Sequence, residues 1–166
     1  MSTMKKQSQQ NLSTADVWAA IGKHSFAVLG FTTPLGEPRT SGVVYATLGH
    51  DLYVAVAPGS WKARYISIDG RVSLTVPVRR GGLLSMVAPI PPATITFPGR
   101  AEVFPSGAPE MAPVVREFGG LLPKERRDEA ALVRIRPEGT FVMYGVGVPL
   151  MRMRDTVAAR ARMPVV

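Results

Sequence analysis

Short runs of aliphatic, β-branched and aromatic residues, each ended by a turn rich in glycine or proline, constrain the fold of this chain most. Such runs are typical of strands. They occupy residues 25–32, 39–48, 52–57, 71–78, 93–104, 133–136 and 140–144. They do not alternate with long helical segments, so a doubly wound parallel sheet is excluded. The pattern predicts a mainly β fold, a six- to seven-stranded antiparallel split barrel with flanking helices.

Four short helices are expected beside the barrel, at residues 14–21, after Ser60, at 109–118 and at 123–132. Ser60 is a good N-cap because its hydroxyl can accept a hydrogen bond from a free amide of the first turn. The last two helices each begin with proline, which suits the first helical position. The sequence therefore predicts a β-barrel with few and short helices.

The length of 166 residues fits a single domain. We expect a disordered N-terminus at 1–13, a cofactor-binding barrel at 14–150 and a basic tail at 151–166, irregular or forming a solvated helix. The N-terminus has no apolar stretch like that of a signal peptide. The longest apolar segment, 83–92, is too short to span a bilayer and contains three prolines. We therefore expect a cytoplasmic protein without a membrane partner, whose 83–92 loop is buried in a dimer contact or over a pocket.

The net charge of +8 raises the question of nucleic-acid binding. The basic residues are scattered along the chain, and several stand beside Asp or Glu, so no continuous basic patch is indicated. We expect no nucleic-acid partner. The charge fits a solvated basic surface, or a site for a small anionic molecule.

Several kinds of chemistry are excluded by missing residues. The chain has no cysteine, which excludes disulfides, thiolate zinc sites and cysteine nucleophiles. Its two histidines, His24 and His50, have no carboxylates spaced for metal ligation, and no G-x-S-x-G run is present. We expect no metal site, and the sequence assigns no catalytic residue.

Lys62 is the most informative single residue, because it falls in the first turn of the helix capped by Ser60. The start of a helix carries unpaired amides and partial positive charge, so it disfavours a lysine. A bound anion would reverse that penalty, since phosphate can accept hydrogen bonds from the amides and from the lysine. The alternative is an exposed lysine that points away from the helix.

The motifs GEPRTSGVVY, SWKARYI and DGRVSL follow one another between Gly36 and Pro77. In their order and placement they resemble the pyridoxamine phosphate oxidase superfamily of FMN-binding split barrels. The resemblance implies an FMN cofactor at the interface of a homodimer, with its phosphate at Lys62. The cofactor-binding residues that it implies are Thr40, Ser41, Gly42, Val43, Val44, Tyr45, Ala55, Val56, Ser60, Trp61, Lys62 and, more loosely, Thr94.

Two residues depart from the pattern of the superfamily. Trp61 stands where phosphate-binding members often have arginine, and Arg39 and Arg64 are the candidates to replace that charge. Tyr45 stands where the oxidases have lysine, which argues against pyridoxamine phosphate as the substrate.

The resemblance implies an FMN-dependent oxidoreductase that acts on a small organic substrate. A flavin carries the redox chemistry itself, so the absence of a catalytic side chain is compatible with this function. Two alternatives stay open. The cofactor can be a deazaflavin, whose longer anionic tail suits the basic surface, or the chain can be a non-catalytic carrier of flavin or haem.

Overall fold

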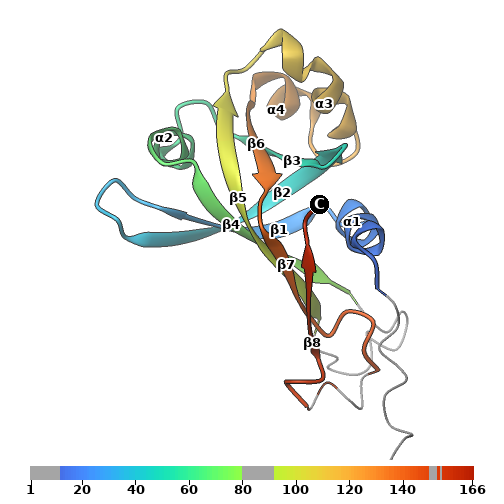
Figure 1. Cartoon of the computed structure of the whole chain (residues 1–166). Coiled ribbons are helices and arrows are strands. Elements are labelled where there is room, and N and C mark those ends of the chain that lie inside the picture. Colours follow the sequence, from blue (N-terminus) through green and yellow to red (C-terminus); the bar gives the residue numbers. More distant parts are fainter. Residues whose placement is uncertain (1–11, 80–91, 150–152, 154) are drawn as a thin grey trace, which may run out of the picture.

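The computed structural model describes residues 12–79, 92–149, 153 and 155–166 (Figure 1). The helices are α1 (Thr14–Gly22), α2 (Trp61–Ile68), the 3₁₀ helix η2 (Pro109–Met111), α3 (Ala112–Glu117) and α4 (Lys124–Glu129). The strands are β1 (Phe26–Thr32), β2 (Pro38–Leu48), β3 (Asp51–Val56), β4 (Arg71–Val78), β5 (Ala93–Phe104), β6 (Ala131–Pro137), β7 (Thr140–Tyr144) and β8 (Arg160–Pro164). The predicted mainly β class is confirmed.

Six strands close into an antiparallel barrel in the order β4-β1-β2-β3-β6-β5, because β4 and β5 also pair with each other. The long strand β5 pairs with β7 through Thr94 to Thr96 and with β6 from Gly99 onward, so its two halves have different partners. The Pro98-Gly99 step lies where the partner changes. The predicted antiparallel barrel is confirmed, and β7 and β8 extend it on one side.

The eighth strand was not predicted. We expected an irregular or solvated helical tail after residue 150, but Arg160–Pro164 pairs with β7 along its whole length. Arg160 and Arg162 are exposed, and the residues that alternate with them, Ala161 and Met163, are half-buried. The alternation of a β-strand was present in the sequence, but the two arginines made the segment resemble a solvated surface.

The barrel interior is filled from alternate positions of each strand. In β1 the side chains of Ala27, Leu29 and Phe31 are buried, whereas Phe26 and Val28 are exposed. Such alternation is expected because successive side chains in a strand point to opposite faces. The barrel interior therefore takes one face of β1, whereas β3 is buried on both faces because Tyr53 belongs to the second hydrophobic cluster.

Gly70 lies between α2 and β4 in the sequence, and it allows the backbone there to approach β5 closely. Its carbonyl accepts a hydrogen bond of 2.7 Å from the amide of Ala101 on β5. A Cβ atom at Gly70 would lie 2.5 Å from the Ala101 carbonyl oxygen, far inside van der Waals contact. Only glycine fits at this point without moving the backbone.

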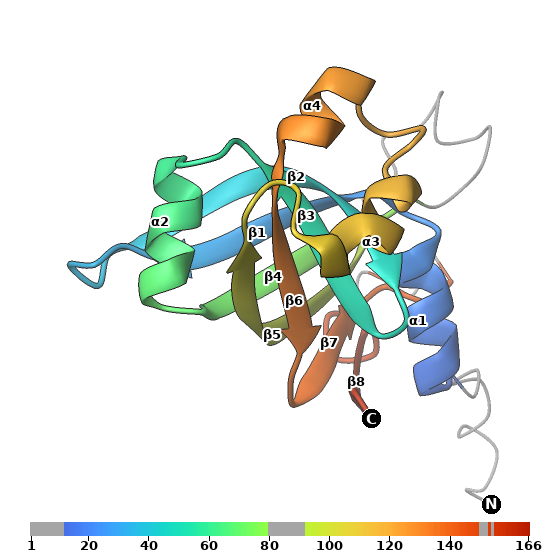
Figure 2. The same cartoon turned by 90° about the horizontal axis from the view of Figure 1, so that it is seen from above.

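Helices α1 and α2 lie on opposite sides of the barrel, and α3 and α4 lie beside β2, β3 and β6 (Figure 2). Helix α2 buries Ala63 and Ile66 against the main core. Helix α3 and η2 bury Met111, Val114 and Phe118 in a second cluster, outside the barrel. These two clusters fix the positions of the helices relative to the strands.

The helix expected at 123–132 ends at Glu129. Ala131 and Leu132 belong instead to β6, where they pair with Val56 and Ala55 of β3. Alanine and leucine favour helices locally, but burial and pairing in the barrel outweigh that preference here. The prediction for these residues was wrong for that reason.

Three further predictions concern the N-terminus, the 83–92 loop and membrane spans. Ser13, which the prediction placed in a disordered N-terminus, caps α1 by a reciprocal capping box with Asp16. The 83–92 loop, apart from Pro92, lies outside the described residues. No helix in the described ranges is long and apolar enough to cross a membrane.

Candidate functional site

The sheet opens between β2 and β3. Their pairing ends at Tyr45 and Val54, and the earlier residues of β2 pair with β1 alone among the described residues. On the other side of the opening, Ala55 and Val56 pair only with β6 in the described part of the chain. Two strand edges therefore face an opening instead of each other.

The direction of the backbone groups at this opening follows from one hydrogen bond. The amide of Tyr45 donates to the Ser25 carbonyl at 2.8 Å, toward β1. Because the direction of these groups alternates along an antiparallel strand, Thr40, Gly42 and Val44 direct their N–H and C=O groups away from β1. Unpaired edges of this kind can bind the polar rim of a flat ligand.

Ala57, Pro58 and Gly59 separate the end of β3 from the cap Ser60, and helix α2 begins at Trp61. The Ser60 hydroxyl accepts a hydrogen bond of 3.3 Å from the Ala63 amide, as predicted for an N-cap. The amides of Trp61 and Lys62 come first in the helix and have no acceptor within the described ranges. The start of α2 therefore has the properties that favour an anion.

The Lys62 side chain is half-buried, and this burial lowers the pKa of its ammonium group from the ordinary value of 10.5. No carboxylate lies within ion-pair distance in the part of the chain that the structure describes. A partly desolvated ammonium without a counter-ion is stabilised by an anion. This environment argues against a lysine that simply points into solvent.

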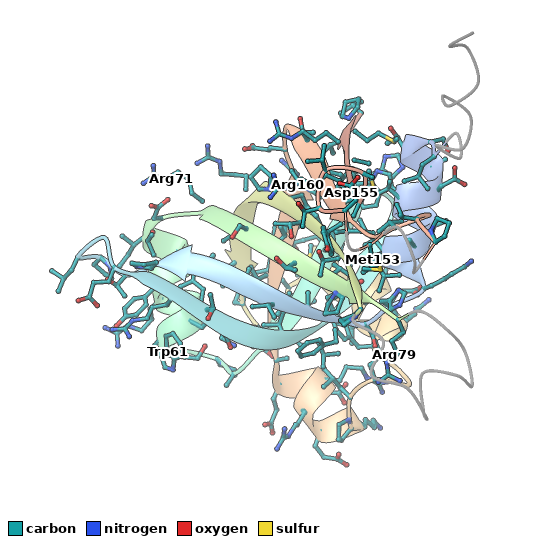
Figure 3. The ribbon with its side chains drawn as sticks, turned by 90° about the horizontal axis from the view of Figure 1, so that it is seen from below. Trp61, Arg71, Arg79, Met153, Asp155 and Arg160 are labelled. Atoms are coloured by element: carbon teal, nitrogen blue, oxygen red, sulfur yellow. The ribbon has the colours of Figure 1, made fainter. Side chains whose placement is uncertain are left out.

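Trp61 lies at the α2 end of the molecule, far from Arg79 and Met153 (Figure 3). Its side chain is 50% exposed, and its ring centroid lies 5.6 Å from that of Phe31 and 5.9 Å from that of Tyr65. The three rings form an apolar wall beside the start of α2. An indole cannot replace the charge of an arginine, so this wall supplies contact area only.

The two arginines proposed to replace that charge differ in availability. Arg39 donates a hydrogen bond of 2.9 Å to Glu37 on the same hairpin, and both side chains are exposed. Arg64, on α2, is exposed and has no carboxylate partner among the described residues. Of the two, Arg64 is the better candidate.

Three predicted residues of β2 point their side chains into the barrel. Val43 and Tyr45 are buried, and Ser41 lies on the same face. The Tyr45 hydroxyl donates to the Ile21 carbonyl at 2.7 Å, and burial raises the pKa of the phenol. Their backbone N–H and C=O groups point toward β1, so neither the side chains nor the backbone groups of these three residues face the opening.

Thr94 is not brought to the opening within one chain. It lies on β5, paired with Pro77 and Tyr144, and β1 and β4 separate it from β2. The outer face of these strands also carries Phe26 and Val28, which are 50% and 37% exposed. Sequence analysis did not single out these two apolar residues, although their alternation with buried Ala27 and Leu29 was a usable signal.

Neither histidine points to catalysis. The Nδ1 atom of His24 lies 2.8 Å from the Ala20 carbonyl oxygen, and the His50 ring stacks on Trp18 at 4.8 Å. Within the described ranges, no three His, Asp or Glu side chains come together as metal ligands would.

Comparison with known proteins gives similarity in structure alone. No family model and no curated protein matches the sequence. A haem-binding protein from Mycobacterium smegmatis has a TM-score of 0.68 at 18% identity, over 93% of this chain and 59% of that protein. An FAD-binding protein from Mesorhizobium loti has a TM-score of 0.59 at 20% identity, over 76% of this chain and 89% of its own.

A third solved structure is a putative pyridoxamine 5'-phosphate oxidase from Listeria innocua. It matches with a TM-score of 0.55 at 15% identity, over 75% of this chain and 93% of its own. The chain therefore has a split-barrel fold similar to that of these three solved structures. In this split barrel, the split is the opening between β2 and β3, and the start of α2 adjoins it in sequence.

Proposed function

We propose that this split barrel binds FMN, with the phosphate at the start of α2 and the ring along the open edge of β2, and that it acts as an oxidoreductase on a small molecule. The half-buried Lys62 ammonium, which has no carboxylate partner in the described chain, is the observation that carries this proposal. A phosphate there would accept hydrogen bonds from Lys62 and from the amides of Trp61 and Lys62.

The open edge of β2 suits the flavin ring. The ring has donors and acceptors along its rim, and the backbone groups of Thr40, Gly42 and Val44 that point away from β1 can supply acceptors and donors on the strand. The Gly42 carbonyl also accepts a hydrogen bond of 3.3 Å from the Ser41 hydroxyl. A Cβ atom at Gly42 would lie 3.1 Å from Cε2 of Phe26, so the Phe26 ring occupies the space beside this residue. A bound flavin supplies hydride or electron transfer, and the residues of this chain bind it and exclude water.

A homodimer would complete the site. The outer face of β1 exposes Phe26 and Val28, which is unfavourable in water and typical of a contact surface. In a two-fold dimer the same surface is used by both copies. Thr94 of a second copy would then be able to reach the cofactor, which it cannot do within its own chain.

Haem is the second candidate, because a haem-binding protein is among the similar structures. Haem iron requires an axial ligand such as histidine. In this chain His50 stacks on Trp18, and His24 lies against Ala20, with its Nε2 atom 3.4 Å from the Arg79 amide. Neither lies on β2 or α2, so the site favours FMN. A deazaflavin is the third candidate, with Arg64 available to its anionic tail.

Titration of the purified protein with FMN, a deazaflavin coenzyme and haem, followed by visible absorption, tests this proposal. Saturable binding of FMN at one site per chain supports it, and preference for another cofactor identifies that alternative. Reduction of the bound cofactor by NADPH, followed by oxidation with a panel of small molecules, then separates an enzyme from a carrier. No saturable binding of any of the three would contradict the cofactor site.

A further inference from the structure

An open pocket of about 370 Å³ lies between η2, α3, α4 and the start of β6. Its apolar wall includes Ala108, Met111, Val115 and Leu132. Met111 and Leu132 are buried in the second hydrophobic cluster, so the floor is fixed by packing. Pockets of this size and composition are typical of small-molecule sites.

The pocket is framed by interactions between its elements. The Ser106 hydroxyl donates a hydrogen bond of 3.0 Å to the Asp128 carbonyl, which ties the loop after β5 to the end of α4. Arg127 packs beside Gly119 at the end of α3, where a Cβ atom would lie 3.4 Å from its Nη1. The hydrogen bond therefore ties α4 to the loop after β5, and Arg127 lies beside the end of α3.

Arg127 is the charged group best placed to recognise a ligand here. Its side chain is only 22% exposed, and its Nε atom lies 3.8 Å from Oδ1 of Asp128, too far for a hydrogen bond. Asp128 is its ion-pair partner at this distance, and no hydrogen-bond acceptor for its guanidinium is present in the part of the chain that the structure describes. Burial of a guanidinium is costly unless its donors are satisfied, so an acceptor from outside the chain would stabilise it.

The charge of the lining decides the class of ligand. Arg116 and Arg127 bring two positive charges, and Asp128 brings one negative charge, which leaves one positive charge. A monoanion balances this charge. The apolar wall favours an alkyl or aromatic body, and a planar guanidinium suits a carboxylate.

We propose that this pocket binds a small apolar monocarboxylate, with its carboxylate on Arg127 and its body against Met111 and Leu132. None of the predicted cofactor residues lines the pocket, so the proposal does not depend on flavin binding. Leu132 pairs with Ala55 across β6 and β3, so the pocket nevertheless adjoins one side of the split.

Isothermal titration with octanoate tests the proposal, with octanol as the neutral probe. We expect saturable binding of octanoate, and a loss of about tenfold in affinity in R127Q, the lower end for a hydrogen bond to a charged group. R126Q is the matched control, because Arg126 is exposed and does not line the pocket. Octanol affinity should be the same in both variants.

A blocking variant keeps the test decisive if R127Q is unstable. Ala112 is exposed and lines the pocket, so A112F should fill it without disturbing the core and abolish octanoate binding. The proposal is overturned if the unmodified protein shows no saturable binding, if R126Q weakens octanoate as much as R127Q, or if A112F binds it unchanged.

Discussion

The Tyr45 hydroxyl donates a hydrogen bond of 2.7 Å to the Ile21 carbonyl inside the barrel. This bond ties β2 to the end of α1 and turns the phenol away from the split. The position therefore serves the fold through both its side chain and its backbone, whose amide donates to the Ser25 carbonyl.

Tyr45→Phe tests the contribution of the Tyr45 hydroxyl to the stability of the fold. It keeps the ring but leaves the Ile21 carbonyl without this donor, so the free energy of unfolding should fall by about 1–2 kcal/mol. Cofactor affinity should not change. Urea denaturation measures the first effect, and Tyr65→Phe, at a half-exposed ring, is the control. Equal stability of Tyr45→Phe and the unmodified protein would contradict this role.

Gly70→Ala should destabilise the barrel, because the new Cβ would meet the Ala101 carbonyl oxygen at 2.5 Å. We expect a loss of about 1–3 kcal/mol, the range for overpacking at a fixed site. Gly120→Ala is the matched control, since nothing lies within 4 Å of a Cβ there. Thermal unfolding compares the two, and equal melting temperatures would show that the backbone adjusts at Gly70.

Asp69 makes part of the stability depend on pH. Its carboxylate accepts hydrogen bonds from Arg71 and from Thr32, and those from Arg71 hold the pKa of Asp69 far below its ordinary value of 3.8. Because the pKa of Asp69 is lower in the folded state than in the unfolded state, its ionised carboxylate stabilises the fold above pH 3.8. This stabilisation is lost as the pH falls below that value.

Urea midpoints of Asp69→Asn and the unmodified protein, measured against pH, test this dependence. The unmodified protein should be more stable at neutral pH, and the difference should shrink on acidification. A difference that stays constant with pH would mean that the carboxylate charge contributes nothing.

Phe26→Lys should dissociate the proposed dimer, because it places a charge on the exposed apolar face of β1. Sedimentation should then give a monomer, and FMN binding should weaken with it. Val157→Lys is the control, since Val157 is 83% exposed in a turn before β8. A Phe26→Lys protein that stays dimeric would show that this face is not the interface.

The sequence predicted all seven strands from β1 to β7, because each has β-type residues and a turn at its ends. The eighth strand was missed, since Arg160 and Arg162 masked its alternation. Ala131 and Leu132 were misassigned because local helix preference is weaker than pairing with β3. Local patterns indicated the elements, whereas closure between β4 and β5 depends on contacts distant in sequence.

The candidate site was predictable to a similar extent. Lys62 was identified because the start of a helix carries partial positive charge and disfavours a lysine unless an anion binds there. The half-buried position of its side chain agrees with an anion site. The inward direction of Tyr45 and the separation of Thr94 from β2 depend on register, which the motifs do not encode. The exposure of Phe26 and Val28 could not be predicted without knowing which face of β1 lies outside the barrel.

The affinities of FMN and riboflavin, compared in the unmodified protein and in Lys62→Ala, test the central claim most directly, because the two ligands differ only in the phosphate. Fluorescence titration should give FMN an advantage of at least about tenfold, as for hydrogen bonds to a charged group. Lys62→Ala should remove most of it, and Lys23→Ala, at an exposed lysine, should not. Equal affinities in the unmodified protein, or an advantage that survives in Lys62→Ala, would contradict a phosphate site at the start of α2.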